Sequence, residues 1–182
     1  MKIPENKTLQ ELFEWRFSRT PDSVAHKFLD RETTYKELNN YSNQVANGLI
    51  ELGCKPDTRI AYYGKNSDFF FEVLIGTLKS NTVTVGVNWR LAPPEVSYVL
   101  NDSESEVLFV GADFYPVIDQ ILEDLPKIKK VVAIDGDHEN YQDYISWRNS
   151  QNSANPEIKS SPNDDILPVS YTHLTLPTNG CV

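Results

Sequence analysis

The feature of this sequence that most constrains its fold is a regular alternation of strand-like and helix-like segments between residues 59 and 134. Short runs rich in β-branched or aromatic residues predict strands at residues 59–63, 82–87, 106–110 and 130–134. Apolar residues at helical spacing predict helices in the gaps, at residues 67–78, 93–100 and 117–125, and the apolar face of the first includes Phe71. Such alternation is typical of an α/β fold with a largely parallel sheet flanked by helices.

Two helices and a short strand are predicted ahead of this region. The first helix covers residues 9–19, and a strand at 24–29 is followed by a polar turn at 30–32. The second helix begins at Thr34, because Glu37 three residues later completes a capping box. Gly53 ends it, and its apolar face is formed by Leu38, Tyr41, Val45, Leu49 and Leu52. After the last strand we expect a short helix within 141–147 and a surface loop at 149–163.

Composition and charge exclude several classes of protein. Hydrophobic residues make up 40% and charged residues 24% of the 182, as in a folded domain. A net charge of −9 argues against a nucleic-acid partner, and the short basic run at residues 127–130 is interpreted as a solvated edge before a strand. Apolar runs stay far below the roughly 18 to 20 residues of a membrane-spanning helix.

Cysteine and histidine usage predicts neither a disulfide framework nor a metal site. Cys54 and Cys181 are far apart, and His26, His138 and His173 form no ligand-spaced pair. The amino terminus lacks the apolar stretch of a secretory signal. We therefore expect a cytoplasmic protein, with its oligomeric state left open.

Four stretches, taken in order, resemble the front part of adenylate-forming (AMP-binding) enzymes. Residues 33–38 resemble the family's T-Y-x-E-L signature, and residues 57–67 its G-D-R-V-A strand with the following N-S turn. Residues 78–91 are similar to L-K-A-G-A-V followed by N-x-R-L, and residues 94–103 match P-E-x-x-x-x-L-x-D-S. The resemblance covers about residues 8–167, and residues 87–95 look most like the fatty-acyl-CoA ligase branch.

Two positions depart from the family's pattern, and the matching residues themselves have structural explanations. Asn81 and Thr58 stand where the family usually has glycine, which bears on local loop shape. Among the matching residues, we expect Tyr35 and Leu38 at cap and core positions, and Asn66 and Ser67 in a turn and helix cap. Arg90 and Glu95 are expected to form a polar pair.

The resemblance implies an ATP-dependent acid–thiol ligase, an acyl-CoA synthetase. In such an enzyme a carboxylic acid, here a fatty acid, is activated as an acyl-adenylate and transferred to coenzyme A, with ATP and Mg²⁺ as further requirements. Other adenylate-forming enzymes remain open: an amino-acid-activating domain, an aryl-CoA ligase or a luciferase-like enzyme. A stand-alone α/β binding module is the alternative from another class.

The family's phosphate loop, Y-T-S-G-T-T-G-x-P-K-G, is expected directly after residues 164–167. The chain instead has Leu174 and Pro177 where glycines belong, and from Pro168 onward it contains no Asp, Glu, Lys or Arg. Residues 169–178 resemble the translation of a transposon-end adapter used in DNA sequencing libraries.

We therefore interpret residues 1–167 as an incomplete N-terminal part of the AMP-binding domain and residues 168–182 as a non-native tail. The chain is expected to be inactive and to bind no cofactor tightly. No catalytic, cofactor-binding or metal-binding residue is assigned.

Overall fold

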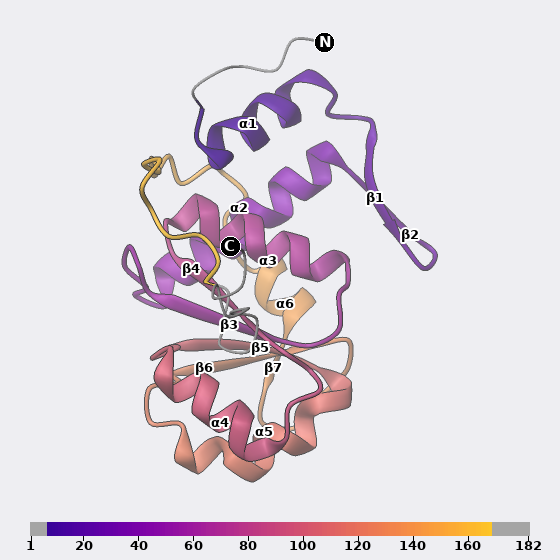
Figure 1. Ribbon diagram of the computed structural model, residues 1–182. Helices are drawn as coiled ribbons and strands as arrows, with labels where there is room; N and C mark the ends of the chain where they lie inside the picture. Colours follow the sequence, from indigo (N-terminus) through magenta and orange to yellow (C-terminus); the bar gives the residue numbers. More distant parts are fainter. Residues whose placement is uncertain (1–6, 169–182) are drawn as a thin grey trace, which may run out of the picture.

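A five-stranded parallel sheet forms the centre of the computed structural model, which describes residues 7–168 (Figure 1). Its strands are β3 (Arg59–Tyr63), β4 (Val83–Val87), β5 (Val107–Gly111), β6 (Lys130–Ile134) and β7 (Gln142–Asp143). Their order across the sheet is β4-β3-β5-β6-β7, and every neighbouring pair is parallel. The predicted α/β fold with a largely parallel sheet is confirmed.

Helices cover both faces of this sheet. On one face lie α2 (Tyr35–Glu51), α3 (Asp68–Ser80) and α6 (Tyr144–Asn149), and on the other lie α4 (Pro93–Asp102) and α5 (Tyr115–Ile121) (Figure 1). Side chains of β3 alternate accordingly. Ile60 and Tyr62 are buried with the α2 and α3 residues, whereas Ala61 and Tyr63 are buried with those of α4 and α5. Apart from Arg59 at its start, β3 is therefore apolar and buried on both faces.

The capping box predicted at the start of α2 is confirmed. The backbone N–H of Glu37 donates to Thr34 Oγ1 at 3.2 Å, and the N–H of Thr34 donates to Glu37 Oε2 at 2.8 Å. Gly53 adopts a left-handed φ of 81° after the helix, as expected. Gly76 lets α2 approach α3 closely, because a Cβ at that position would lie 2.5 Å from Val45 Cγ1.

The segment after β1 (Val24–Phe28) corrects a prediction. Residues 30–32 were expected to form a turn, but β2 (Arg31–Thr34) pairs antiparallel with β1, so Arg31 and Glu32 are strand residues. Leu29, at a φ of 53°, lies in the turn. The strand pattern is weak because the hairpin is largely solvent-exposed and its polar side chains do not alternate with apolar ones.

Two side chains predicted to face the core lie nearer the surface. Phe71 is 46% exposed and Leu52 is 37% exposed. In α3, Phe69 and Val73 occupy the buried positions instead, and Phe71 packs against His26 with ring centroids 5.8 Å apart. The predicted helix at 141–147 is also shifted, because β7 comes first and the Asp143 side chain caps α6 by accepting from Ser146 N–H at 2.8 Å.

The first helix and the loop after α6 pack on the outer side of α2. Helix α1 (Leu9–Arg19) has its own capping box, and Glu14 from this helix pairs with the buried Lys79 of α3. Residues 150–168 form no helix or strand, which confirms the predicted loop. Side-chain amides hold this loop. Asn43 Nδ2 donates to the carbonyl of Ser153 at 2.8 Å, and Gln10 Nε2 donates to that of Ile158 at 2.7 Å.

A buried ion pair joins α6 to α3. Arg148 Nη1 donates to Glu72 Oε2 at 2.7 Å, and the Tyr144 hydroxyl donates to the same oxygen at 2.7 Å. The side chains of Arg148 and Glu72 are 7% and 2% exposed, so neither charge has much access to water. Burial raises the pKa of Glu72, and the neighbouring guanidinium opposes that rise. The Arg148 guanidinium also lies 3.8 Å from the ring centre of Tyr41 in α2.

We predict that Glu72→Ala lowers the free energy of unfolding by roughly 3–5 kcal/mol, because it leaves the buried Arg148 charge unpaired. Urea unfolding followed by circular dichroism measures this change. The matched control is the double variant Glu72→Leu with Arg148→Met, which removes both charges and should recover most of the loss. A single variant within about 0.5 kcal/mol of the parent would show that the pair does not hold α6.

Candidate functional site

The topology of the sheet marks one edge as the place for a ligand. The chain leaves β3 through α3 toward β4, but it leaves β5 through α5 toward β6, which lies on the opposite side. Where neighbouring strands connect in opposite directions, their carboxyl ends leave a crevice, and ligands of open α/β sheets bind there. In this chain the crevice lies beyond the ends of β3 and β5.

A hollow of about 350 Å³ occupies this position, and we call it the carboxyl-edge crevice. It is lined by the loops after β3, β5 and β6 and by the tip of the β1–β2 hairpin. The pairing of β3 with β5 continues to Tyr63 and Val110, at the mouth of the crevice. Gly64 and Gly111 follow these residues and lie close together, since a Cβ on Gly64 would make ordinary contact with the backbone nitrogen of Gly111, at 3.6 Å.

Arg31 fixes the hairpin beside the crevice. Its Nε and Nη2 each donate to a carboxylate oxygen of Asp68 at 2.7 Å, at the start of α3. The guanidinium also lies 4.8 Å from the ring centre of Phe69. The hydrogen bonds with Asp68 raise the pKa of Arg31. The guanidinium therefore stays charged and bound to Asp68.

The charges of the crevice are balanced. Lys65 Nζ lies 2.7 Å from Asp113 Oδ2, and the remaining charged lining residues are Arg31 and Asp135. The lining thus carries two cations and two carboxylates. Lys65 contacts Asp113, and Arg31 contacts Asp68 at the start of α3. A polyphosphate needs a surplus of positive charge or a row of backbone amides, and the crevice residues supply no such surplus.

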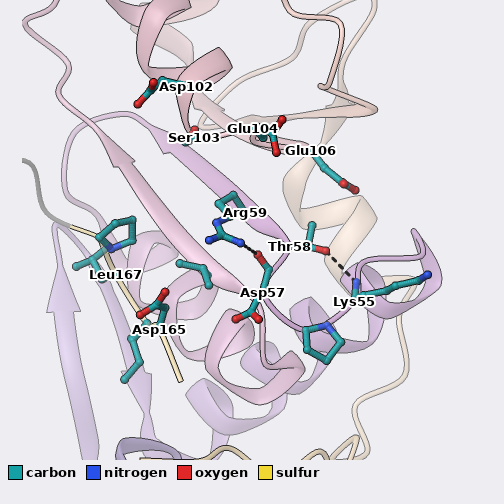
Figure 2. A pocket seen from close by; sticks show the side chains of 14 residues that line it. Lys55, Asp57, Thr58, Arg59, Asp102, Ser103, Glu104, Glu106, Asp165 and Leu167 are labelled. Atoms are coloured by element: carbon teal, nitrogen blue, oxygen red, sulfur yellow. Dashed lines mark hydrogen bonds between the residues drawn. The ribbon is translucent and has the colours of Figure 1, made fainter. Parts of the chain in front are cut away.

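A larger hollow of about 780 Å³ lies at the opposite edge of the sheet, at the amino ends of β3, β4 and β5 (Figure 2). Its lining carries five carboxylates, those of Asp57, Asp102, Glu104, Glu106 and Asp165, against two cations, Lys55 and Arg59. Both ATP and a carboxylic acid are anions, so this acidic surface repels them. We assign it no part in binding them, despite its size.

The basic run at residues 127–130 lies near the same edge. Lys129 Nζ is 2.6 Å from Glu106 Oε2 and Lys127 Nζ is 3.6 Å from Glu104 Oε1, and both lysine side chains are largely exposed. The run precedes β6 directly. The prediction of a solvated edge before a strand is confirmed.

The residues that carried the resemblance have structural roles. Leu38 is buried, and Tyr35 packs against the small core formed by Phe17, Leu38 and Ile75. Asn66 lies in the short loop between β3 and α3. Ser67 occupies the N-cap position, but its side chain makes no cap hydrogen bond and its hydroxyl lies 3.1 Å from that of Tyr62. Ser67 thus lies at the predicted cap position, but its hydroxyl is hydrogen-bonded to Tyr62 and not to the helix.

Arg90 and Glu95 do not act as the predicted pair. Glu95 Oε2 accepts from the backbone N–H of Ala92 at 2.8 Å and so caps α4. The Arg90 guanidinium lies 4.4 Å from the ring centre of Trp89, which is 39% exposed, and Lys65 Nζ lies 5.8 Å from the same ring. The two side chains therefore make different contacts, Glu95 with the backbone at the start of α4 and Arg90 with an aromatic ring.

The two departures from the family's glycines leave their turns intact. Asn81 adopts the left-handed conformation at the end of α3, with a φ of 55°, which asparagine tolerates better than most residues. Next to Thr58, Asp57 has a φ of 65°, and Thr58 Oγ1 accepts from the N–H of Lys55 at 3.0 Å. Short polar side chains therefore replace glycine at these positions.

Within residues 7–168, no group of three or more His, Cys, Asp or Glu side chains is placed to hold a metal ion. The helices of that same part of the chain are too short or too polar to cross a membrane. The departures noted at residues 171–180 lie outside the described residues.

We predict that Asp135→Asn raises thermal stability at neutral pH by about 1–4 °C. Asp135 lies just after β6 with a φ of 63°, a conformation that asparagine also accepts, and partial desolvation raises the pKa of its carboxyl group. Because the native state binds this proton more tightly than the unfolded state, stability decreases as pH rises through the interval between the ordinary and the raised pKa. Asp135→Asn removes this pH-dependent loss of stability.

The advantage of Asp135→Asn should shrink toward about pH 3, where the carboxyl is protonated in both states. Asp137→Asn, two residues away, is the matched control for loss of a negative charge. Melting curves from pH 3 to 8 give the comparison. Equal gains from both variants, or a gain that does not depend on pH, would contradict a specific effect at Asp135.

Comparison with known proteins identifies the family. The model of the AMP-binding enzyme family matches residues 13–172. The fatty acid–acyl-carrier-protein ligase ScoC of Streptomyces coeruleorubidus is 32% identical over 169 residues, which are 93% of this chain and 31% of that protein. The chain thus spans about a third of the length of this relative.

Solved structures agree with this comparison. The anthranilate CoA ligase AuaEII, in complex with anthranoyl-AMP, superposes with a TM-score of 0.79 at 28% identity, over 89% of this chain and 32% of that one. The N-terminal domain of FACL13 from Mycobacterium tuberculosis also gives a TM-score of 0.79, at 27% identity, over 88% of this chain and 41% of that one. The family match extends over most of this chain, so the chain belongs to the AMP-binding enzyme family.

Proposed function

We propose that this chain is the front part of an ATP-dependent acid–thiol ligase. In the proposed reaction, a carboxylate oxygen attacks the α-phosphate of ATP, forming an acyl-adenylate and releasing pyrophosphate. A thiol sulfur then attacks the acyl carbonyl, forming a thioester and releasing AMP. The observation that carries the proposal is the family match over residues 13–172.

A fatty acid is the substrate class that we favour. The run at residues 87–95 resembles the fatty-acyl-CoA ligase branch, and the relative ScoC is named a fatty acid ligase. The printed name of ScoC also gives an acyl carrier protein as the acceptor, so the thiol belongs to coenzyme A or to a carrier protein. An aryl acid is the main alternative, because AuaEII was solved with anthranoyl-AMP.

The described residues do not by themselves fit ATP and Mg²⁺. The crevice has balanced charges, and residues 7–168 hold no cluster of metal-ligating side chains. Glycines in that range occur singly, at 48, 53, 64, 76, 86, 111 and 136, so they form no loop of free amides for a triphosphate. We therefore derive no catalytic step from these residues, and we propose that the chain alone is inactive.

We predict that the purified chain releases no pyrophosphate above the enzyme-free rate when it is incubated with ATP, Mg²⁺, coenzyme A and a panel of fatty acids. The ScoC protein, assayed in parallel with a carrier protein, is the positive control. Calorimetry with ATP should likewise give no binding heat. Turnover would refute the proposed inactivity, whereas tight nucleotide binding without turnover would favour the stand-alone binding module.

A chimera tests the proposed role itself. Residues 8–167 of this chain replace the aligned front segment of ScoC, and pyrophosphate release is measured with fatty, aryl and amino acids. We expect release with fatty acids, because this segment would then be joined to the remainder of a ligase. A chimera that unfolds cooperatively at a temperature close to that of ScoC, but activates none of the acids, would contradict the proposal.

A further inference from the structure

His26 on β1 is a partly buried histidine that joins the β1–β2 hairpin to α3. Its ring stacks on that of Phe71, with ring centroids 5.8 Å apart and an angle of 29° between the planes. Its Nε2 atom is buried and forms no hydrogen bond with any residue that the structure describes. The ring therefore contributes packing between the hairpin and α3, although it carries a nitrogen that can bind a proton.

A small hollow of about 110 Å³ lies beside His26, where the hairpin meets α3. Its lining comes from the hairpin and from the loop and first turn of α3: His26, Lys27, Phe28, Asn66, Ser67, Asp68 and Phe71. Phe28, Asn66 and Ser67 also line the carboxyl-edge crevice. The two hollows thus adjoin, so a change in how the hairpin sits on α3 alters the crevice.

Asp68 shares this small hollow with His26, and it already has a cationic partner. Its side chain is 3% exposed, and Arg31 Nε and Nη2 each donate to one of its oxygens at 2.7 Å. Because Arg31 stays charged, a protonated His26 places a second cation beside one carboxylate. The imidazolium then either competes with Arg31 for Asp68 or stays unpaired in a partly buried site.

The other charged residues of the hairpin and of the helices packed against it, α2 and α3, are bound elsewhere or exposed. The bound ones are Lys27 with Glu32, Glu37 with the backbone of Thr34, Glu72 with Arg148 and Lys79 with Glu14, and the exposed ones are Asp30, Lys36 and Glu51. Of all these groups, it is the charge of Asp68 that favours protonation of His26.

Burial lowers the pKa of His26, and the charge of Asp68 opposes this change. The docked hairpin therefore binds the proton less tightly than a detached hairpin does. Docking is strongest above the ordinary histidine pKa of about 6.5, where the ring is neutral in both states. It weakens as pH falls through the interval between that value and the lowered pKa.

We propose that the β1–β2 hairpin is an acid-sensitive strap at the carboxyl-edge crevice, and that protonation of His26 detaches it from the start of α3. Detachment breaks the stacking on Phe71 and the contact between Arg31 and Asp68. Because the hairpin tip lines the crevice, its departure widens the crevice and exposes the Asp68 carboxylate. Leu29 at the tip is 82% exposed, so the tip adds little packing to hold the strap.

Amide hydrogen exchange of the purified chain, measured by NMR at pH 7.5 and pH 5.5, tests this proposal. Protection factors, which correct for the intrinsic exchange rate at each pH, should fall about threefold or more for the amides of β1 and β2 at the lower pH. The amides of the central strand β5 are the internal reference and should keep their protection. A parallel NMR titration of the His26 ring should give a midpoint below pH 6.5.

His26→Phe separates the proton from the packing. Phenylalanine keeps an aromatic ring against Phe71 but does not titrate, so the protection of the hairpin amides should no longer depend on pH between 5.5 and 7.5. His138→Asn is the matched control, because this histidine lies beside Asp119, away from the hairpin, and its loss should leave the pH dependence unchanged. His26→Gln replaces His26→Phe if the phenylalanine variant does not fold.

Two results would overturn the proposal. Unchanged or increased protection of the hairpin at pH 5.5 would show that protonated His26 stays docked, paired with Asp68. An equal loss of protection in the folded His26→Phe or His26→Gln variant would assign the effect to other groups, such as the carboxyl of Asp135 in the crevice. Both measurements follow the hairpin of this chain alone, so they do not depend on the proposed ligase function.

Discussion

Burial of β3 and β5 on both faces is the constraint on which the rest of this structure depends. A parallel sheet is stable only when helices cover each side, and here α2, α3 and α6 cover one side while α4 and α5 cover the other. The connections that place these helices also reverse direction between β3 and β5. One topological requirement thus creates both the core and the carboxyl-edge crevice.

Polar contacts hold the outer layer on this core. The buried Glu72–Arg148 pair attaches the short helix α6 to α3, and the partly exposed Arg31–Asp68 pair attaches the hairpin beside the crevice. In both cases a long cationic side chain also packs on an aromatic ring, which adds to the contact. The Arg31–Asp68 pair thereby positions the hairpin at the crevice, but it leaves no surplus charge there for a nucleotide.

Much of the fold could be predicted because its signals are local. The strand at 59–63, the capping box at Thr34 and the stop at Gly53 each follow from residues close in sequence, and each is confirmed. The hairpin strand at Arg31 and the exposure of Phe71 could not be predicted in this way. The hairpin is local, but its polar and largely exposed residues give no alternating pattern. The position of Phe71 depends on its packing against His26, which lies far earlier in the sequence.

The family was also predictable, because four ordered stretches carry it, and the match over residues 13–172 confirms it. The candidate site was harder to predict from the sequence. The carboxyl-edge crevice follows from the order of the strands. The packing of Arg90 on Trp89, with Glu95 capping α4, depends on side-chain contacts that spacing in the sequence does not show. No catalytic residue is assigned, because the residues that carry the resemblance lie at cap, loop and core positions.

The measurement that tests the central claim most directly is the genomic DNA sequence downstream of the codon for residue 167. If the chain is the front part of an adenylate-forming ligase, the natural reading frame continues into a glycine-rich phosphate loop of the form Y-T-S-G-T-T-G-x-P-K-G, and the codons for residues 168–182 are absent from the genome. A genomic frame that encodes residues 168–182 and stops after Val182 would contradict the account.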